Sequence, residues 1–459
     1  MDIPVFHLDV LNDRVLIAII AVLHVVINHG MAVGGIPLVA YLERRGLATG
    51  DEAWDALAFR ILTVFFIVTT TVGALTGVGI WFSAALVNPY AMGSLLRVFF
   101  WTWFTEWLVF VTEIVLILAY YLTWKKWRGP RKHAHVRLGG ALSAASWATM
   151  ALIVSILSFM MDPGSWHSDK TLFSGMFNPV YLPQLAFRTP LAMIMAGAFA
   201  LAIVAWSEED ASMRARAVRT ISSWILVWML PCAAGGFWYA RAVPSAMAAN
   251  LPIALGTQAL QAWSRTALAV LGGACAVIAI VALWGARKPN STRTWALVVP
   301  ALLSILLIGA FERVREFVRK PYAIAGYLYS NGLRKDDYPL LQRDGLLARA
   351  TYTRVRRITE ANEVDAGREV FLLACTRCHT VDGVNGIRSV LAAMYGDDRP
   401  WDREAIASYV GSMHDLRPFM PPFPGNEREK NALAVYLEHL QLHRETLEGA
   451  QSTGVVIEP

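Results

Sequence analysis

Long apolar runs dominate the first two thirds of the chain. Eight of them have the roughly 20 apolar residues that a helix needs to cross a bilayer, at about 15–41, 57–87, 98–124, 138–161, 185–206, 220–243, 263–284 and 294–311. A segment rich in Arg and Tyr follows, and amphipathic helical patterns complete the chain. We therefore predict an all-α protein with a polytopic membrane helix bundle at 1–311, a connecting segment at 312–360 and a compact domain at 361–459.

Composition agrees with this interpretation. Hydrophobic residues make up 56% of the chain and charged residues only 17%, which is typical of an integral membrane protein and not of a soluble enzyme. The formal net charge is +6. Because the basic residues lie mainly in short loops between apolar runs, we interpret them as a topology signal and not as a nucleic-acid-binding surface.

The loop charges predict which side each loop faces. The loops after runs one, three, five and seven carry Arg44, Arg45, Arg60, Lys125, Lys126, Arg128, Arg131, Lys132, Arg137, Arg214, Arg216, Arg219, Arg287, Lys288 and Arg293. The opposite ends carry little more than Arg14, Arg97 and Lys170. By the positive-inside rule, the N-terminus and everything after the eighth run lie on the periplasmic side of a bacterial inner membrane. The first run is too long for a signal peptide and we expect it to stay as a span.

Cys375-Thr376-Arg377-Cys378-His379 is a C-x-x-C-H motif. In this spacing the two thiols bond the vinyl groups of a haem while the adjacent imidazole ligates its iron. The motif predicts one covalently attached haem c, with a redox dithiol as the alternative. Haem attachment normally occurs outside the cytoplasm, which agrees with the side predicted from loop charge.

The segment from Gly367 to about Leu442 resembles a small class I monohaem cytochrome c, with Met420-Pro421-Pro422-Phe423 after the C-x-x-C-H motif and Tyr436-Leu437 in a last helix. The resemblance implies that Met420 is the sixth iron ligand, opposite His379. Met413, His414, Met394 and His439 are competing ligands.

Ionisable side chains inside apolar runs are costly, so each is a functional candidate. They are His24 and His29 in the first run, Glu106 and Glu113 in the third, and Arg188 at the start of the fifth. His24 and His29 lie roughly 140° apart around a regular helix and cannot both face one iron. Glu106 and Glu113 are seven residues apart and share a face, as a proton path requires. The structural alternatives are a hydrogen bond from His29 to a neighbouring helix, and pairing of the glutamates with Arg97 or Arg188.

The first run, from Arg14 through His24 to Gly30-Met31-Ala32, resembles the first helix of subunit I of cytochrome bd-type quinol oxidases. Glu106 and Glu113 resemble that family's two membrane acids, and Asn178-Pro179-Val180 resembles the start of its fifth helix. Glu316-Phe317-Val318-Arg319-Lys320-Pro321-Tyr322, followed by Gly326, resembles its Glu-x-Gly-Arg-x-Pro-Trp signature, with Val318 and Tyr322 as departures. The likeness covers roughly residues 10–330.

This resemblance implies that His24 ligates one membrane b-type haem and Glu316 another, or that one of them ligates the only one retained, with Arg319 also in the cofactor site. Where the family has a His ligand of its low-spin haem, this chain has Arg188, and we see no opposing Met in run seven. We therefore expect that haem to be missing. The loop that carries quinol oxidation in the family is shortened here to about 244–262, and a ninth helix is absent.

These features predict a membrane respiratory electron-transfer protein. It would pass electrons between haem c and one or two membrane b haems, with oxygen as a candidate acceptor. One alternative is a quinol:cytochrome c oxidoreductase subunit that exports electrons to periplasmic carriers. Another is a docking or assembly subunit without membrane haem. Partners implied are other membrane subunits, periplasmic cytochromes and, in the first alternative, quinol.

Overall fold

The computed structural model describes residues 4–207, 210–255 and 264–443. Contacts divide the chain into two compact units. The membrane unit comprises Ile20–Gly79 and Ser94–Val318, and the C-terminal unit comprises the described parts of Met1–Ile19, Ile80–Gly93 and Arg319–Pro459. The division expected from the sequence differs from this one, because the last long helix continues to Val318 and two early segments group with the C-terminal residues.

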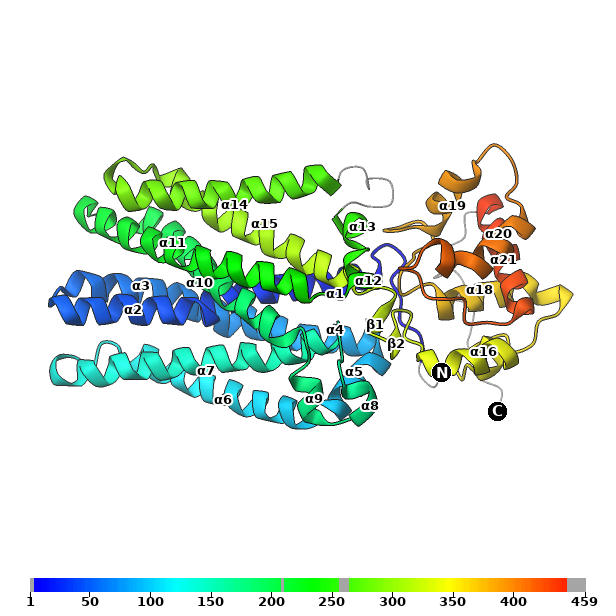
Figure 1. Cartoon of the computed structure of the whole chain (residues 1–459), viewed down its shortest axis with the longest axis horizontal. Helices are drawn as coiled ribbons and strands as arrows, with labels where there is room; N and C mark the ends of the chain where they lie inside the picture. Colours follow the sequence, from blue (N-terminus) through cyan, green and yellow to red (C-terminus); the bar gives the residue numbers. More distant parts are fainter. Residues whose placement is uncertain (1–3, 208–209, 256–263, 444–459) are drawn as a thin grey trace. The chain divides into compact units, whose positions relative to one another are not determined.

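The described residues up to Val318 are almost entirely helical (Figure 1). In order the elements are α1 (Asp13–Ile27), the π-helical turn η1 (Asn28–Val33), α2 (Gly35–Thr49), α3 (Glu52–Val68), the π-helical turn η2 (Thr69–Gly73), α4 (Ala74–Val87), α5 (Pro89–Val98), α6 (Phe100–Thr123), α7 (Lys132–Phe159), α8 (Trp166–Asp169), α9 (Leu172–Met176), α10 (Tyr181–Ser207), α11 (Ala211–Ala242), α12 (Ser245–Ala248), α13 (Leu251–Leu255), α14 (Ser264–Arg287) and α15 (Thr294–Val318). The shortened loop predicted at 244–262 contains α12 and α13, and its part beyond residue 255 lies outside the described residues.

Within the described chain, eight helical stretches are long and apolar enough to cross a membrane, which confirms the predicted number of spans. They are Asp13–Thr49, Glu52–Val87, Phe100–Thr123, Gly129–Phe159, Tyr181–Ser207, Ala211–Ala242, Ser264–Arg287 and Thr294–Val318. The first two are composite, because a π-helical turn joins two α-helices in each.

Glycines explain the first composite span. A Cβ atom on Gly30 would lie 2.2 Å from the Phe199 ring, and one on Gly34 would lie 2.0 Å from the Ala192 carbonyl oxygen. Only glycine permits α10 to approach η1 so closely. In the second composite span, the hydroxyls of Thr69, Thr70 and Thr71 donate back to carbonyls of the preceding turn at 2.7, 2.6 and 2.6 Å. Such bonds compete with the regular helical pattern, and π-helical turns occur often at functional sites.

Helix α10 lies at the centre of the membrane unit and contacts α2, α7, α11 and α15. Its packing on α11 is close because Gly235 of α11 faces the backbone of Ala186, where a Cβ would lie 2.4 Å from the carbonyl oxygen. Small and branched side chains fill the surrounding core, including Ala196, Ala200 and Ile221. This central position puts the side chains of α10 within reach of several other helices.

The C-terminal unit is helical apart from one small hairpin. Its elements are β1 (Tyr322–Ile324), β2 (Leu328–Tyr329), α16 (Tyr338–Asp344), α17 (Leu346–Arg349), α18 (Glu363–Ala374), α19 (Ile387–Tyr395), α20 (Arg403–Leu416) and α21 (Glu427–Leu442). Strands β1 and β2 pair antiparallel. The turn between them contains Gly326 at φ +68°, a conformation that favours glycine.

The predicted connecting segment shares a buried core with the last four helices. Leu341, Leu346 and Leu347 belong to the same apolar cluster as Phe371 and Leu437. The buried carboxylate of Glu429 in α21 accepts hydrogen bonds from the backbone N–H groups of Leu346 and Leu347, at 2.8 and 2.7 Å. These bonds fix the start of α17 to α21.

Helices α18 and α21 cross at Gly367. A Cβ there would lie 2.0 Å from the carbonyl oxygen of Ala432 and 2.7 Å from the Cβ of Tyr436. The backbones therefore touch at this point, about two helical turns before the C-x-x-C-H motif begins.

We predict that Gly367→Ala destabilises the C-terminal unit by about 1–3 kcal/mol, because an added methyl group must force the two backbones apart. Gly411→Ala is the matched control: it also lies inside a helix, and its Cβ would meet only the flexible end of Lys430 at 3.4 Å. Urea-dependent proteolysis of the C-terminal unit in the full-length protein measures both. Equal protease resistance of the two variants would contradict the packing described here.

Candidate haem sites

The C-x-x-C-H motif forms a tight turn directly after α18. Cys375 caps the helix, its N–H bonding the Phe371 carbonyl at 2.9 Å. The N–H groups of Cys378 and His379 both bond the Cys375 carbonyl at 3.0 Å. The helix end therefore holds both thiols and the imidazole in one compact loop, as covalent haem attachment requires.

The His379 ring is oriented for iron ligation. Its Nδ1 lies 3.1 Å from the carbonyl oxygen of Asn385, to which it donates. Burial lowers the pKa of His379 to about 4, so the imidazole is neutral and Nε2 keeps the lone pair that a metal needs. A backbone carbonyl in this position is the usual partner of a ligating histidine.

The Cys375 thiol does not fit the reactive cysteine of a redox dithiol. Burial raises the pKa of Cys375 to about 12, whereas a reactive C-x-x-C pair needs a thiol whose pKa is lowered so that the thiolate forms. The local chemistry therefore favours haem attachment over the alternative.

Early segments of the chain hold the motif in place within the C-terminal unit. The N–H of Val384 donates to the carbonyl of Val10 at 3.0 Å, and the Asn12 amide donates to the carbonyl of Cys378. The buried guanidinium of Arg377, inside the motif, donates to the carbonyls of Val87 at 3.1 Å and Asn331 at 2.6 Å. The motif is thus bonded to the residues just before the first span and to the last residue of the second.

Met420 lies in the loop that follows α20. His414 donates from Nδ1 to the Met420 carbonyl at 2.6 Å. Met413 packs against the apolar core, and Met394 is exposed on α19. His439 stacks on His443 with ring centroids 4.1 Å apart. Met420 therefore stays the predicted sixth ligand.

His24, half-buried in α1, is oriented in a similar way. Its Nδ1 lies 3.2 Å from the Gly73 carbonyl oxygen in η2 and 3.3 Å from Oγ1 of Thr76. A Cβ on Gly77 would lie 3.2 Å from the ring, so glycine leaves room for the imidazole. With Nδ1 donating to a carbonyl, Nε2 is free to ligate an iron, and the residue fits a haem site.

The signature at the end of α15 is divided between the two units. Glu316 occupies the last turn of α15, is half-buried, and interacts electrostatically with Arg315. Arg319 is buried and donates from Nη1 to the Ala323 carbonyl at 2.6 Å. Arg319 therefore forms a hydrogen bond with the backbone of β1. Glu316 stays a candidate haem ligand.

Arg188 does not fit a haem ligand. Its buried guanidinium donates to Nε2 of His29 at 3.1 Å and to Oε1 of Glu312 at 2.5 Å, and Arg315 donates to Oε2 of Glu312 at 2.8 Å. A guanidinium stays protonated and offers no lone pair to iron. The network also gives His29 the hydrogen bond to another helix that was one of its structural alternatives.

Glu113 is held by hydroxyl groups of α7 and not by Arg97 or Arg188. Ser146 and Thr149 donate to its carboxyl oxygens at 2.5 and 3.3 Å. Glu106 lies two turns earlier on the same face of α6 and is half-buried. Both acids stay candidates for proton transfer, since hydroxyl partners suit a carboxyl group that changes its protonation state.

Sequence reasoning missed a second buried polar cluster in the membrane unit. Glu43 of α2 contacts Nδ1 of His135, Nζ of Lys132 and the hydroxyl of Tyr120, at 2.5, 2.6 and 2.6 Å. Lys132 also contacts Asp55. The sequence places Lys132 in a basic loop and gives no signal that Glu43 is near it.

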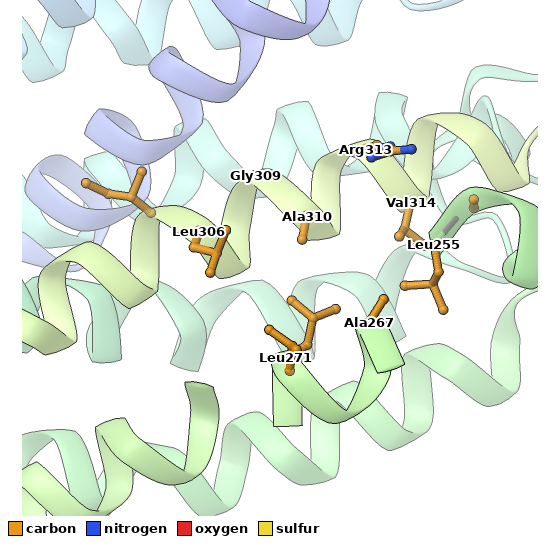
Figure 2. A pocket seen from close by; sticks show the side chains of 11 residues that line it. Leu255, Ala267, Leu271, Leu306, Gly309, Ala310, Arg313 and Val314 are labelled. Carbon is orange, nitrogen blue, oxygen red and sulfur yellow. The ribbon is translucent and has the colours of Figure 1, made fainter. Parts of the chain in front are cut away.

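A cavity of about 450 Å³ lies between α13, α14 and α15. Figure 2 shows Leu306, Ala310 and Val314 of α15 facing Leu271 and Ala267 of α14 across it. Arg313 is the one charged residue among its described lining residues, which include no imidazole, thioether, thiol or carboxylate. This cavity therefore offers no haem ligand.

Comparisons with known proteins agree with both parts of this description. A family model described as cytochrome bd terminal oxidase subunit I matches residues 13–314. A second, described as cytochrome C oxidase, cbb3-type, subunit III, matches residues 362–437. No curated protein sequence matches the chain.

The solved structure of bd oxidase from Geobacillus thermodenitrificans is similar, with a TM-score of 0.56 over 70% of this chain and 90% of that chain, at 17% identity. That likeness shows the fold. The cytochrome c domain implies covalent haem c, and the bd family implies membrane b-type haems. Because the first family model covers about two thirds of its length, the chain belongs to the cytochrome bd terminal oxidase subunit I family and, with its cytochrome c domain, is a membrane respiratory electron-transfer protein.

Proposed function

We propose that the chain accepts electrons at haem c from a periplasmic carrier and passes them to a b-type haem in the membrane, where oxygen is reduced. Cys375, Cys378, His379 and Met420 would hold haem c. His24 would ligate a membrane haem, with Glu316 as the second candidate ligand.

The observation that carries this proposal is the attachment of the C-x-x-C-H loop to the ends of two spans. Cys378 and Arg377 bond to Asn12 and Val87, and α1, which begins at Asp13, also carries His24 eleven residues further on. Both candidate haem sites therefore belong to one chain, which suits electron transfer within it.

The same contacts support a periplasmic position for haem c. Asn12 precedes the first span and Val87 ends the second, so both belong to the same side of the membrane. The basic loops after spans one, three, five and seven favour the other side as cytoplasmic. Protons for oxygen reduction would then come from the cytoplasm along Glu106 and Glu113.

Respiratory electron carriers are the partners that the family implies. The direction of electron flow distinguishes a cytochrome c oxidase from a quinol:cytochrome c oxidoreductase. Two departures from the family pattern favour the first: Arg188 stands where the family has a ligand of its low-spin haem, and the loop that carries quinol oxidation in the family is shortened here.

We predict that the purified full-length protein gives a pyridine haemochromogen spectrum with one c-type haem and at least one b-type haem. Reduced cytochrome c should support oxygen consumption, and a quinol should not. A spectrum with haem c but no haem b would show that the spans only anchor the cytochrome c domain, and it would exclude an oxidase function. Reduction of haem c by quinol, without oxygen uptake, would establish the reverse flow.

His24→Ala should remove one b-type haem per chain while haem c stays attached, because only the membrane haem would lose its iron ligand. The matched control is His133→Ala, which removes an exposed imidazole at the start of α7. Iron and haem b per polypeptide measure the effect. Retention of the full b-haem absorbance in His24→Ala would show that another residue is the ligand.

Met420→Ala should lower the midpoint potential of haem c by more than about 60 mV, one decade in the one-electron equilibrium constant, because Met/His ligation raises the potential of haem c. Met394→Ala, at an exposed methionine of the same unit, is the control. Spectroelectrochemical titration of the full-length protein measures both. An unchanged potential in Met420→Ala together with a fall in Met394→Ala would reassign the ligand.

A further inference from the structure

The buried cluster around Glu43 lies where four helices of the membrane unit begin or end. Glu43 is in the last three turns of α2, Tyr120 is near the end of α6, and Lys132 and His135 are in the first turn of α7. Asp55 is near the start of α3. The side chains of Glu43 and His135 are completely buried, whereas that of Asp55 is 25% exposed. The cluster therefore extends inward from a point that water reaches.

The hydrogen bonds of His135 require a proton to be held at this place. Its Nε2 lies 2.9 Å from the Tyr120 carbonyl oxygen, so Nε2 carries a hydrogen and donates. Its Nδ1 lies 2.5 Å from Oε1 of Glu43. Such a contact needs a hydrogen between the two atoms, supplied either by an imidazolium or by a protonated carboxyl group. Glu43 and His135 therefore share one proton that either can carry.

The surrounding charges favour retention of this proton. The carboxylates of Glu43 and Asp55 face one ammonium group, that of Lys132. The shared proton brings their sum to zero, and its loss would leave an uncompensated negative charge away from water, which is costly. The Tyr120 hydroxyl donates to the other Glu43 oxygen at 2.6 Å, and its ring stacks on the imidazole at 4.6 Å.

The same two helices connect this cluster with the membrane acids. Tyr120, Glu113 and Glu106 are spaced by seven residues on α6 and share one face. On α7, Ser146 and Thr149, which bond Glu113, follow His135 in the same helix. Gly139 lies between them, and a Cβ there would be 2.8 Å from the Tyr120 hydroxyl, so glycine admits the phenol to the α6–α7 contact.

We propose that the Glu43–His135 pair is a proton-loading site that supplies protons to Glu113 and then to Glu106. This inference rests on the proposed function. The shared proton leaves the pair and passes along water molecules over the two helical turns to a carboxylate oxygen of Glu113, forming an O–H bond there. A proton from bulk water, arriving beside Asp55, replaces it. No electron changes place in these steps, and Tyr120 orients the Glu43 carboxylate as a positioning residue.

The test is proton uptake by the full-length holoprotein in detergent when its haems are reduced electrochemically, followed with a pH-indicator dye. Glu43→Gln should slow uptake by about tenfold or more, since it removes the group that exchanges the proton. Glu52→Gln removes an exposed carboxylate near the same helix ends and should leave the rate unchanged. Tyr120→Phe should also slow uptake, while Tyr121→Phe, whose ring stacks on Phe66, should not.

Uptake at the wild-type rate in Glu43→Gln would overturn the proposal and leave the cluster as a structural link between helices. If Glu43→Gln does not fold, Tyr120→Phe decides, because it keeps the backbone carbonyl that bonds His135 and all the charges. Absence of any proton uptake on reduction in the wild-type protein would also overturn it. Failure of the oxidase function is distinguishable, since it would abolish oxygen consumption while redox-linked proton uptake still responds to Glu43→Gln.

Discussion

The cost of placing charge in hydrocarbon governs the membrane unit. A lone buried charge is expensive, and removal of one partner from a buried pair costs about 3–5 kcal/mol. Glu312 faces two arginines, from α10 and α15, and Glu43 faces Lys132 and His135 of α7. These pairs join α10 to α15 and α2 to α7. Which helices pack against each other therefore depends on these ion pairs as well as on the glycine contacts of α10.

In the C-terminal unit the same cost applies to buried backbone carbonyl groups. The carbonyls of Val87, Asn331 and Cys378 receive donors from Arg377 or Asn12. Buried carbonyls need such partners. The Arg377–Val87 and Asn12–Cys378 bonds join residues 290 and 366 positions apart, and the Arg377–Asn331 bond joins residues 46 positions apart. Satisfying these carbonyls joins the haem-binding loop to Asn12 and Val87 within the C-terminal unit.

Local sequence patterns sufficed for the eight spans and for the haem c motif, because apolar length and the C-x-x-C-H spacing are both local properties. They did not indicate that Lys132 pairs with Glu43, or that Arg188 pairs with Glu312. Each pair joins residues about 90 or more positions apart, so it depends on which helices adjoin. Glu43 also directly precedes Arg44 and Arg45, which the sequence pattern assigned to a basic loop. Its burial inside the bundle was therefore not predicted. The ligands Met420, His24 and Glu316 stay predictions that the geometry supports unequally.

Arg188 is the buried charge of α10 whose partners lie on two other helical segments. A guanidinium at this position needs acceptors from two directions, and His29 and Glu312 provide them. An arginine where the resemblance places a haem ligand therefore requires a carboxylate on α15 as well, so this departure from the family pattern involves two helices and not one residue alone. If the low-spin haem is missing, as the resemblance implies, electrons must enter the bundle at another site. We propose haem c, held by Cys375, Cys378 and His379, as this entry site.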